Sequence, residues 1–170
     1  FDIQGKQKGI RILRRAHGWY AQVLVECENA EPQSKKVAEC GIDLGLKSFA
    51  TLDNGEKIAN PRVLRESQAK LKREQRKLSR CQKGSGRRKK QVNRVARLHE
   101  KVKRKRRGFA HRLARDIVNR FDRIAVEKLN VKGMARGRLS KSVSDAGWSI
   151  FLEILRDKAE NAGRELVEVD

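Results

Sequence analysis

The sequence contains few cysteine, proline and aromatic residues. Of 170 residues, 3 are cysteine and 2 are proline, and aromatic residues make up 5%. Cys27, Cys40 and Cys81 are too few and too widely spaced for a disulfide framework or a zinc site, so we expect reduced thiols. No apolar run approaches the roughly 20 residues of a membrane-spanning helix and no signal peptide is recognisable, which favours a soluble, cytoplasmic protein.

Acidic residues are also scarce relative to basic ones. The chain has 42 Lys and Arg against 21 Asp and Glu, a formal net charge of +21 with a pI near 10.6. Such a balance indicates a polyanionic partner, and nucleic acid is the leading candidate. The length suits one main core. The first residue is Phe1 and the last, Asp170, ends a strand-like run, so we expect both ends to be cut from a longer protein.

The basic residues are concentrated in one segment. Residues 70 to 120 hold 22 Lys and Arg but 3 Asp and Glu, a net charge of +19. A solvated helical surface is the simpler interpretation, but this charge density favours binding to phosphates, which carries little sequence information. We predict phosphate contacts for Lys47 and for eleven residues of this segment: Arg87, Arg88, Lys89, Lys90, Arg94, Arg97, Lys103, Arg104, Lys105, Arg106 and Arg107.

Hydropathy patterns predict a mixed α/β chain. Residues 8 to 26 alternate apolar and polar side chains around a His-Gly turn, which predicts a β-hairpin. Residues 27 to 38 are polar and include a proline, which predicts a linker and a domain boundary. From Gly41 apolar residues recur at every second position, and a later Asp-Asn-Gly sequence predicts a turn into another short strand.

Helical spacing dominates after Pro61. Leu64, Leu71 and Leu78, seven residues apart, predict a helix from Val63 that ends near the glycines of residues 83 to 86. An antiparallel partner helix is predicted from apolar spacings of three and four, its stripe being Val92, Val95, His99, Val102, Arg106, Phe109, Leu113 and Ile117.

The last third of the chain predicts two further strands. Arg123–Glu127 has the character of a central strand and is followed by a loop with two glycines. Ser144 or Asp145 can cap a final helix that Gly163 closes, and residues 165 to 169 return to a strand. Helical crossovers would make these later strands parallel to the strand at Gly41.

Two acids stand out in this pattern. Asp43 lies in a half-buried strand, where an ordinary solvent-facing residue is the simpler interpretation, but Gly41 and Gly45 on its own face would leave room for a phosphate backbone. Glu127 ends an apolar central strand, a costly place for an uncompensated charge. If the strands are neighbours, the two carboxylates could hold Mg²⁺ or Mn²⁺ and support phosphodiester hydrolysis.

Three segments resemble a known family. GIDLGLKSFATLDNG, FAHRLARDIVNRFDRIAVEKLNVKGM and SKSVSDAGWSIFLEILRDKAENAGRELVEVD resemble the RuvC-like nuclease domain of the TnpB (OrfB) proteins of insertion sequences, relatives of the miniature type V CRISPR effectors. The segment KGIRILRRAHGWYAQVLVE resembles the end of the preceding β-barrel domain. We therefore expect a barrel end and linker at residues 1 to 38 and a RuvC-like domain at 39 to 170.

The resemblance implies an RNase H-like fold and an RNA-guided DNA endonuclease, for which we expect Mg²⁺ or Mn²⁺ as the cofactor. Asp43 matches the first catalytic Asp and Glu127 the catalytic Glu, and a guide RNA and a target DNA would be the partners. The third catalytic acid of the family lies on a helix beyond a zinc ribbon, and the sequence shows neither. We therefore expect weak cleavage or none from the chain itself.

Other titratable residues are expected to have structural roles. Glu168 and Asp170 map to the strand before the zinc ribbon, Asp145 is a candidate helix cap or nucleic-acid contact, and His99 and His111 are expected to pack or to contact phosphates. Two alternatives to the nuclease remain: a non-catalytic nucleic-acid-binding protein that uses the basic helical pair, and a transposase with similar acidic chemistry.

Overall fold

The structure is a computed structural model that describes residues 5–26, 38–134, 136 and 140–169. Contacts divide the chain into two compact units, one formed by Phe1–Ala30 and Ser67–Lys101 and the other by Glu31–Glu66 and Val102–Asp170. One unit boundary falls after Ala30, within the predicted linker, and the other two fall within the two long helices, so the units differ from the predicted division at residue 38. The assignment of residues 1–38 and 39–170 to two domains stays a prediction.

The first unit contains a β-hairpin and parts of two helices. Strands β1 (Lys6–Arg15) and β2 (Gly18–Glu26) pair antiparallel around the predicted turn. Arg97 Nε donates a hydrogen bond to the carbonyl oxygen of Ala16 at 2.9 Å, which joins the hairpin turn to a helix of the same unit. The predicted linker lies mostly outside the described residues.

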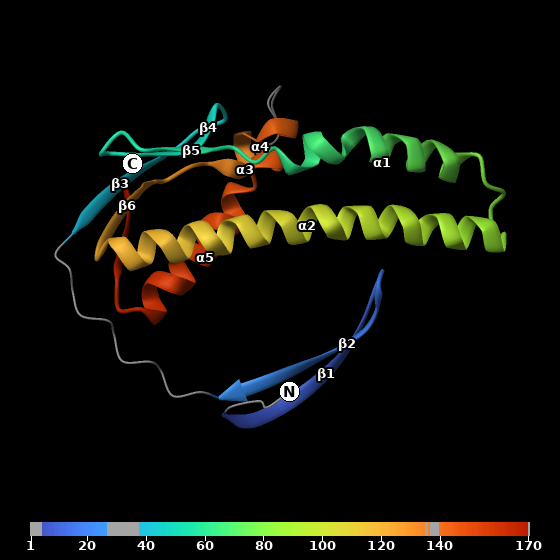
Figure 1. The fold of residues 1–170 in the computed structure, drawn as a ribbon, viewed down its shortest axis with the longest axis horizontal. Coiled ribbons are helices and arrows are strands. Elements are labelled where there is room, and N and C mark those ends of the chain that lie inside the picture. Colours follow the sequence, from blue (N-terminus) through green and yellow to red (C-terminus); the bar gives the residue numbers. More distant parts are fainter. Residues whose placement is uncertain (1–4, 27–37, 135, 137–139, 170) are drawn as a thin grey trace. The chain divides into compact units, whose positions relative to one another are not determined.

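The helices form the predicted antiparallel pair. Helix α1 spans Val63–Ser79 and helix α2 spans Gly86–Arg120 (Figure 1). Gln91 Nε2 of α2 donates to Glu74 Oε2 of α1 at 2.8 Å and to the Glu74 carbonyl oxygen at 3.0 Å. Gly84 has a φ of 84°, a left-handed conformation that suits glycine in the connecting turn. Helix α2 continues through Gly108 without interruption.

The second unit is built on a five-stranded mixed sheet in the order β5-β4-β3-β6-β7. The strands are β3 (Glu39–Leu44), β4 (Ser48–Leu52), β5 (Lys57–Ala59), β6 (Arg123–Glu127) and β7 (Glu165–Val169). Strands β3, β4 and β5 form an antiparallel meander, whereas β3, β6 and β7 run parallel. These directions confirm the predicted mixed sheet and its parallel crossovers.

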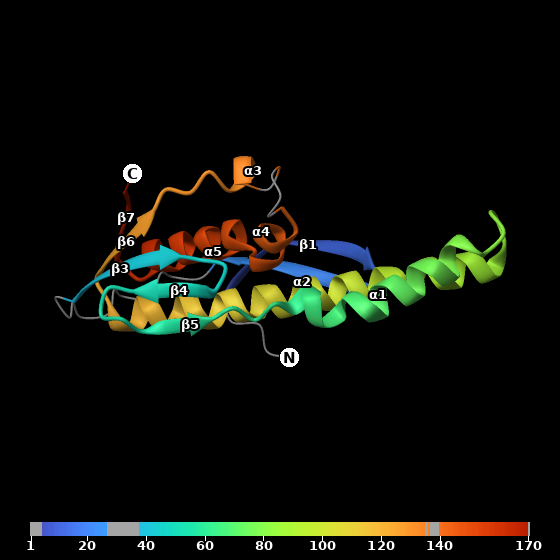
Figure 2. The same cartoon turned by 90° about the horizontal axis from the view of Figure 1, so that it is seen from above.

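One face of this sheet carries the core. Helix α5 (Trp148–Asn161) and the last turns of α2 pack on the same face as Ile42, Val126 and Leu52 (Figure 2). The chain passes from β3 to β6 to β7 in one direction across the sheet, and right-handed crossovers in one direction place both connecting helices on one face. The side chains that alternate with the core residues therefore point to the other face.

Two local features differ from prediction. The loop expected after β6 contains a short helix, α3 (Val131–Met134), which begins where Asn130 Oδ1 accepts a hydrogen bond from the Gly133 amide at 2.9 Å. The final helix is divided into α4 (Ser140–Ala146) and α5 at Gly147, whose φ of 73° interrupts helical geometry. The prediction of a final helix capped by Ser144 or Asp145 is therefore wrong, because Gly147 precedes the first residue of α5. In the part of the chain that is described, no helix is long and apolar enough to cross a membrane.

Candidate active site

Asp43 and Glu127 lie side by side in the sheet register. Strands β3 and β6 are parallel, with Gly41 opposite Ala125 and Ile42 opposite Val126. Asp43 and Glu127 are the next residue on each strand, and neighbouring strands are about 4.8 Å apart. Both side chains are exposed, and alternation places them on the face opposite the core. The structure therefore brings together the two acids predicted from sequence.

The two acids occupy the centre of a row across four strands. Asp43 lies opposite Thr51 on β4, and Glu127 lies opposite Val169 on β7. Among the described residues, no cation forms an ion pair with either carboxylate. Two carboxylates with free oxygens on a solvent-facing surface match the hard donors that Mg²⁺ or Mn²⁺ takes from proteins, with the remaining positions left to water and substrate phosphate.

The structure gives the neighbouring glycines a packing environment of their own. The face beside Gly41 is occupied by Asp53, whose Oδ2 accepts a hydrogen bond from the Gly41 amide at 2.9 Å. A Cβ at Gly41 would lie 3.7 Å from the Asp53 Cβ, and one at Gly45 would lie 3.2 Å from the Ser48 carbonyl oxygen. A side chain at Gly45 would therefore crowd the Ser48 carbonyl, whereas one at Gly41 would make an ordinary contact with Asp53. Room for a phosphate backbone beside Asp43 stays a prediction.

Asp53 is a third acid near this face, and its sequence context predicts only a turn residue. It also influences Cys40: burial, and then the neighbouring Asp53 carboxylate, together raise the pKa of the Cys40 thiol from 9.0 to about 11. No group of three His, Cys, Asp or Glu side chains is arranged to hold a metal ion within the described ranges. The Asp53 carboxylate accepts a hydrogen bond from the Gly41 amide, and the proposed pair of acids does not include it.

Glu168 has the structural role expected from the sequence. It lies opposite Val126, hence on the core face rather than beside Glu127, and forms an ion pair with Arg156 of α5. Asp170 lies outside the described residues.

Asp145 is a helix cap, but for a distant helix. Its Oδ1 accepts a hydrogen bond from the Leu64 amide at 2.8 Å and its Oδ2 from the Arg65 amide at 3.1 Å, at the first turn of α1. Arg106 Nη2 of α2 donates to the same Oδ1 at 2.9 Å. The buried carboxylate thus joins α4, α1 and α2 within the second unit.

The predicted phosphate-contacting residues divide into two groups. Arg88 and Arg106 are half-buried: Arg88 donates to the carbonyl oxygen of Leu78 at the end of α1, and Arg106 pairs with Asp145. Their positions favour structural roles. The others are exposed, namely Lys47, Arg87, Lys89, Lys90, Arg94, Arg97, Lys103, Arg104, Lys105 and Arg107. His99 and His111 are also exposed, so they do not pack in the interior.

Sequence comparison identifies the family. The OrfB_IS605 family, described as "Probable transposase", matches residues 22–138. The chain belongs to the OrfB_IS605 family. This family match spans both candidate acids and the basic helical pair, and it confirms the resemblance to TnpB (OrfB) proteins.

Curated relatives of this OrfB_IS605 chain are named as nucleases. A "Putative RNA-guided DNA endonuclease" of Streptomyces pristinaespiralis is 38% identical over 157 residues, which cover 92% of the chain and 39% of the relative. InsQ of Escherichia coli K12, with the same description, is 27% identical over 86% of the chain and 40% of its own length. The chain therefore spans about two fifths of the relatives it matches.

A solved structure shares the fold. The cryo-EM structure of a CRISPR-Cas12f ternary complex aligns with 89% of the chain and 32% of its own chain at a TM-score of 0.50 and 20% identity. This likeness supports the mixed α/β architecture and the resemblance to miniature type V effectors in fold.

Proposed function

We propose that the chain supplies the nuclease part of an RNA-guided DNA endonuclease, with a RuvC-like variant of the RNase H-like fold. The observation that carries the proposal is the adjacent placement of Asp43 and Glu127 on the solvent-facing side of β3 and β6. The match to OrfB_IS605 and the names of the relatives support the same function. A guide RNA and a target DNA are the proposed partners.

Asp43 and Glu127 would hold Mg²⁺ or Mn²⁺. When bound, such an ion supplies Lewis-acid activation of water and of the phosphodiester. The chain's own contribution is to fix the two carboxylates on adjacent central strands, whose backbone and core packing keep the spacing constant. The exposed cations of the basic helical pair would hold the nucleic-acid backbone by charge.

The test is cleavage of labelled target DNA by the complete protein that carries this chain, with its RNA, in Mg²⁺ and in EDTA. Asp43→Ala and Glu127→Ala should each abolish Mg²⁺-dependent cleavage while leaving RNA binding intact. Asp157→Ala, which removes an exposed acid of α5, is the matched control and should cleave normally. Full cleavage by either active-site variant would contradict the proposal.

The chain alone is expected to cleave weakly or not at all, because a third acid of the family's site would come from another segment. Robust Mg²⁺-dependent cleavage by the 170-residue chain, abolished by Asp43→Ala, would show that the two acids suffice.

A non-catalytic nucleic-acid-binding function is the second candidate, favoured by the net charge of +19 in residues 70 to 120. It requires no divalent metal and predicts binding that is insensitive to Asp43→Ala. Dependence of DNA cleavage on both acids separates the two functions, and the appearance of joined rather than cut strands would instead indicate a transposase.

A further inference from the structure

A basic cavity lies where the β3–β4 turn meets the start of α1. Its volume is about 310 Å³, near the lower end of ligand-binding pockets in proteins. Three cationic side chains line it, together with a hydroxyl, an amide, an aliphatic side chain and one carboxylate: Lys47, Arg62, Arg65, Ser142, Asn60, Leu46 and Asp145. All of these residues belong to the second unit.

The single carboxylate does not neutralise these cations. The charge of Asp145 is matched by Arg106 at 2.9 Å and by the amides of Leu64 and Arg65. No ion pair is formed by the side chains of Lys47, Arg62 or Arg65 within the described residues. The cavity therefore carries an excess of positive charge that folding does not use.

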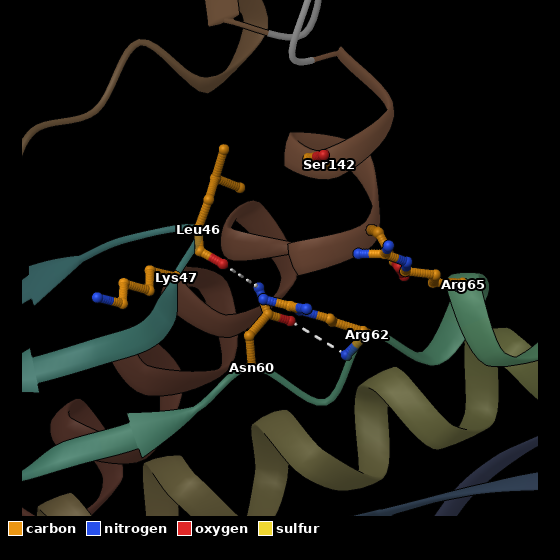
Figure 3. A pocket seen from close by; sticks show the side chains of 7 residues that line it. Leu46, Lys47, Asn60, Arg62, Arg65 and Ser142 are labelled. Atoms are coloured by element: carbon orange, nitrogen blue, oxygen red, sulfur yellow. Dashed lines mark hydrogen bonds between the residues drawn. The ribbon is translucent and has the colours of Figure 1, made fainter.

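The two arginines are positioned by the chain itself. They extend from the start of α1 back toward the β3–β4 turn, whereas the Lys47 ammonium points away from them (Figure 3). Asn60 links the two segments: its Nδ2 donates to the Leu46 carbonyl oxygen at 3.2 Å, and its Oδ1 accepts from the Arg62 amide at 3.1 Å. Two guanidinium groups thus border one cavity.

Arg62 has an unfavourable backbone conformation. Its φ is 41°, in the left-handed region that costs a non-glycine residue free energy. Asn60 and the start of α1 fix this conformation. Glycine would be the low-energy residue here, so an arginine at this position indicates that its side chain has a use.

We propose that this cavity binds a backbone phosphate of nucleic acid through Arg62 and Arg65, with Lys47 at its edge. Planar guanidinium groups pair well with phosphate oxygens. Lys47 is four residues beyond Asp43, so their Cα atoms are at most roughly 14 Å apart. One strand could therefore occupy the cavity and approach Asp43. The proposal rests on the proposed function in taking nucleic acid as the partner.

The test is binding of a fluorescent single-stranded DNA oligonucleotide to the 170-residue chain in EDTA, as a function of salt. Arg62→Gln and Arg65→Gln should each weaken binding about threefold to tenfold and reduce the magnitude of the salt slope by about 0.7, the value for one lost single-strand phosphate contact. The matched control Lys158→Gln removes one positive charge from the last turn of α5, on the core face of the sheet, and should change binding less than twofold.

Arg62→Gly separates binding from folding. Because glycine adopts the left-handed conformation readily, this variant should melt at the same temperature as the wild type or higher, yet bind DNA as weakly as Arg62→Gln. Binding by both arginine variants equal to that of Lys158→Gln would overturn the proposal. The proposal would also be overturned if inorganic phosphate bound saturably in a manner that requires Arg62 and Arg65, while DNA binding did not require them.

Failure of this proposal is distinguishable from failure of the nuclease function. The assay contains no metal, so its outcome does not depend on the metal site. A loss of binding in the arginine variants with no metal-dependent cleavage by the complete protein would support the phosphate site and contradict the nuclease. Normal DNA binding in these variants, together with cleavage by the complete protein that depends on Asp43, would contradict the phosphate site and support the nuclease.

Discussion

Asp43 and Glu127 are adjacent because β3 and β6 pair in parallel with a constant offset, Glu39 opposite Arg123 and Ile42 opposite Val126. The two acids have the same offset in sequence, so alternation and register together place them in one row. Strand β3 was predictable from its period of two, and β6 from its short apolar run. The role of Asp53 was not predictable, because an Asp-Asn-Gly turn gives no sign that the Asp carboxylate will accept a hydrogen bond from the Gly41 amide.

The reactivity of the buried Cys40 thiol can be tested by alkylation. Burial, with Asp53 nearby, raises its pKa to about 11, so the reactive thiolate is scarce at pH 8. Relative to an unperturbed thiol with a pKa of 9.0, the thiolate fraction alone should slow alkylation on the order of a hundredfold. Mass spectrometry after iodoacetamide treatment at pH 8 should show Cys81 modified before Cys40. Equal rates in the native protein would show that Cys40 is neither buried nor perturbed.

At the scale of elements, Asp145 holds three helices together, which no local pattern in the sequence predicts. Its partners Leu64 and Arg65 are 81 and 80 residues away along the chain, whereas a capping pattern in a sequence points only to the residues that directly follow it. Asp145→Ala should lower the free energy of unfolding by about 2–4 kcal/mol, because α1 loses its cap and Arg106 loses its partner in a largely buried site.

Chemical denaturation measures this effect, and Ser142→Ala on the same helix is the control, expected within about 0.5 kcal/mol of wild type. The double variant with Arg106→Ala should lose less than the sum of the two single variants, since the residues share one interaction. A loss below about 0.5 kcal/mol for Asp145→Ala would contradict the assigned role.

The contact between α1 and α2 should be sensitive to acid. Hydrogen bonds from Gln91 and then from Lys77 lower the pKa of Glu74 below 4.5. A carboxylate with a lowered folded pKa stabilises the fold above its unfolded pKa, and this contribution is lost as the pH falls through the folded pKa. Helix content followed by circular dichroism from pH 7 to pH 3 should therefore show reduced thermal stability below about pH 4.5.

Glu74→Gln should make this acid dependence shallower, whereas Glu66→Gln, which alters an exposed acid of the same helix, should retain it. An unchanged pH profile in Glu74→Gln would show that Glu74 is not responsible.

At the scale of the whole molecule, charge is the property read most directly from sequence. The exposure of most cations of the basic helical pair agrees with the predicted surface for phosphate binding, whereas Arg88 and Arg106 show that a dense basic run also supplies caps and ion pairs. Composition cannot separate these roles, because each depends on contacts between distant segments.

This charge predicts a strong salt dependence of nucleic-acid binding. If about six phosphates are contacted, the logarithm of the binding constant should fall with the logarithm of salt concentration with a slope near −4 for single strands. Fluorescence anisotropy between 50 and 200 mM salt would measure it, with roughly equal affinities for oligonucleotides of unrelated sequence. A slope near zero would exclude the basic helical pair as a binding surface.

The proposed function requires Asp43 and Glu127 to act together as a metal site, and Mn²⁺ binding to the chain can be observed by NMR. We predict that Mn²⁺ broadens the amide signals around these two residues first, on β3 and β6. The double variant Asp43→Asn and Glu127→Gln should lose this broadening, whereas Asp157→Asn should retain it. Broadening at the same amides in the double variant, or none there in the wild type, would show that these two acids do not form a metal site.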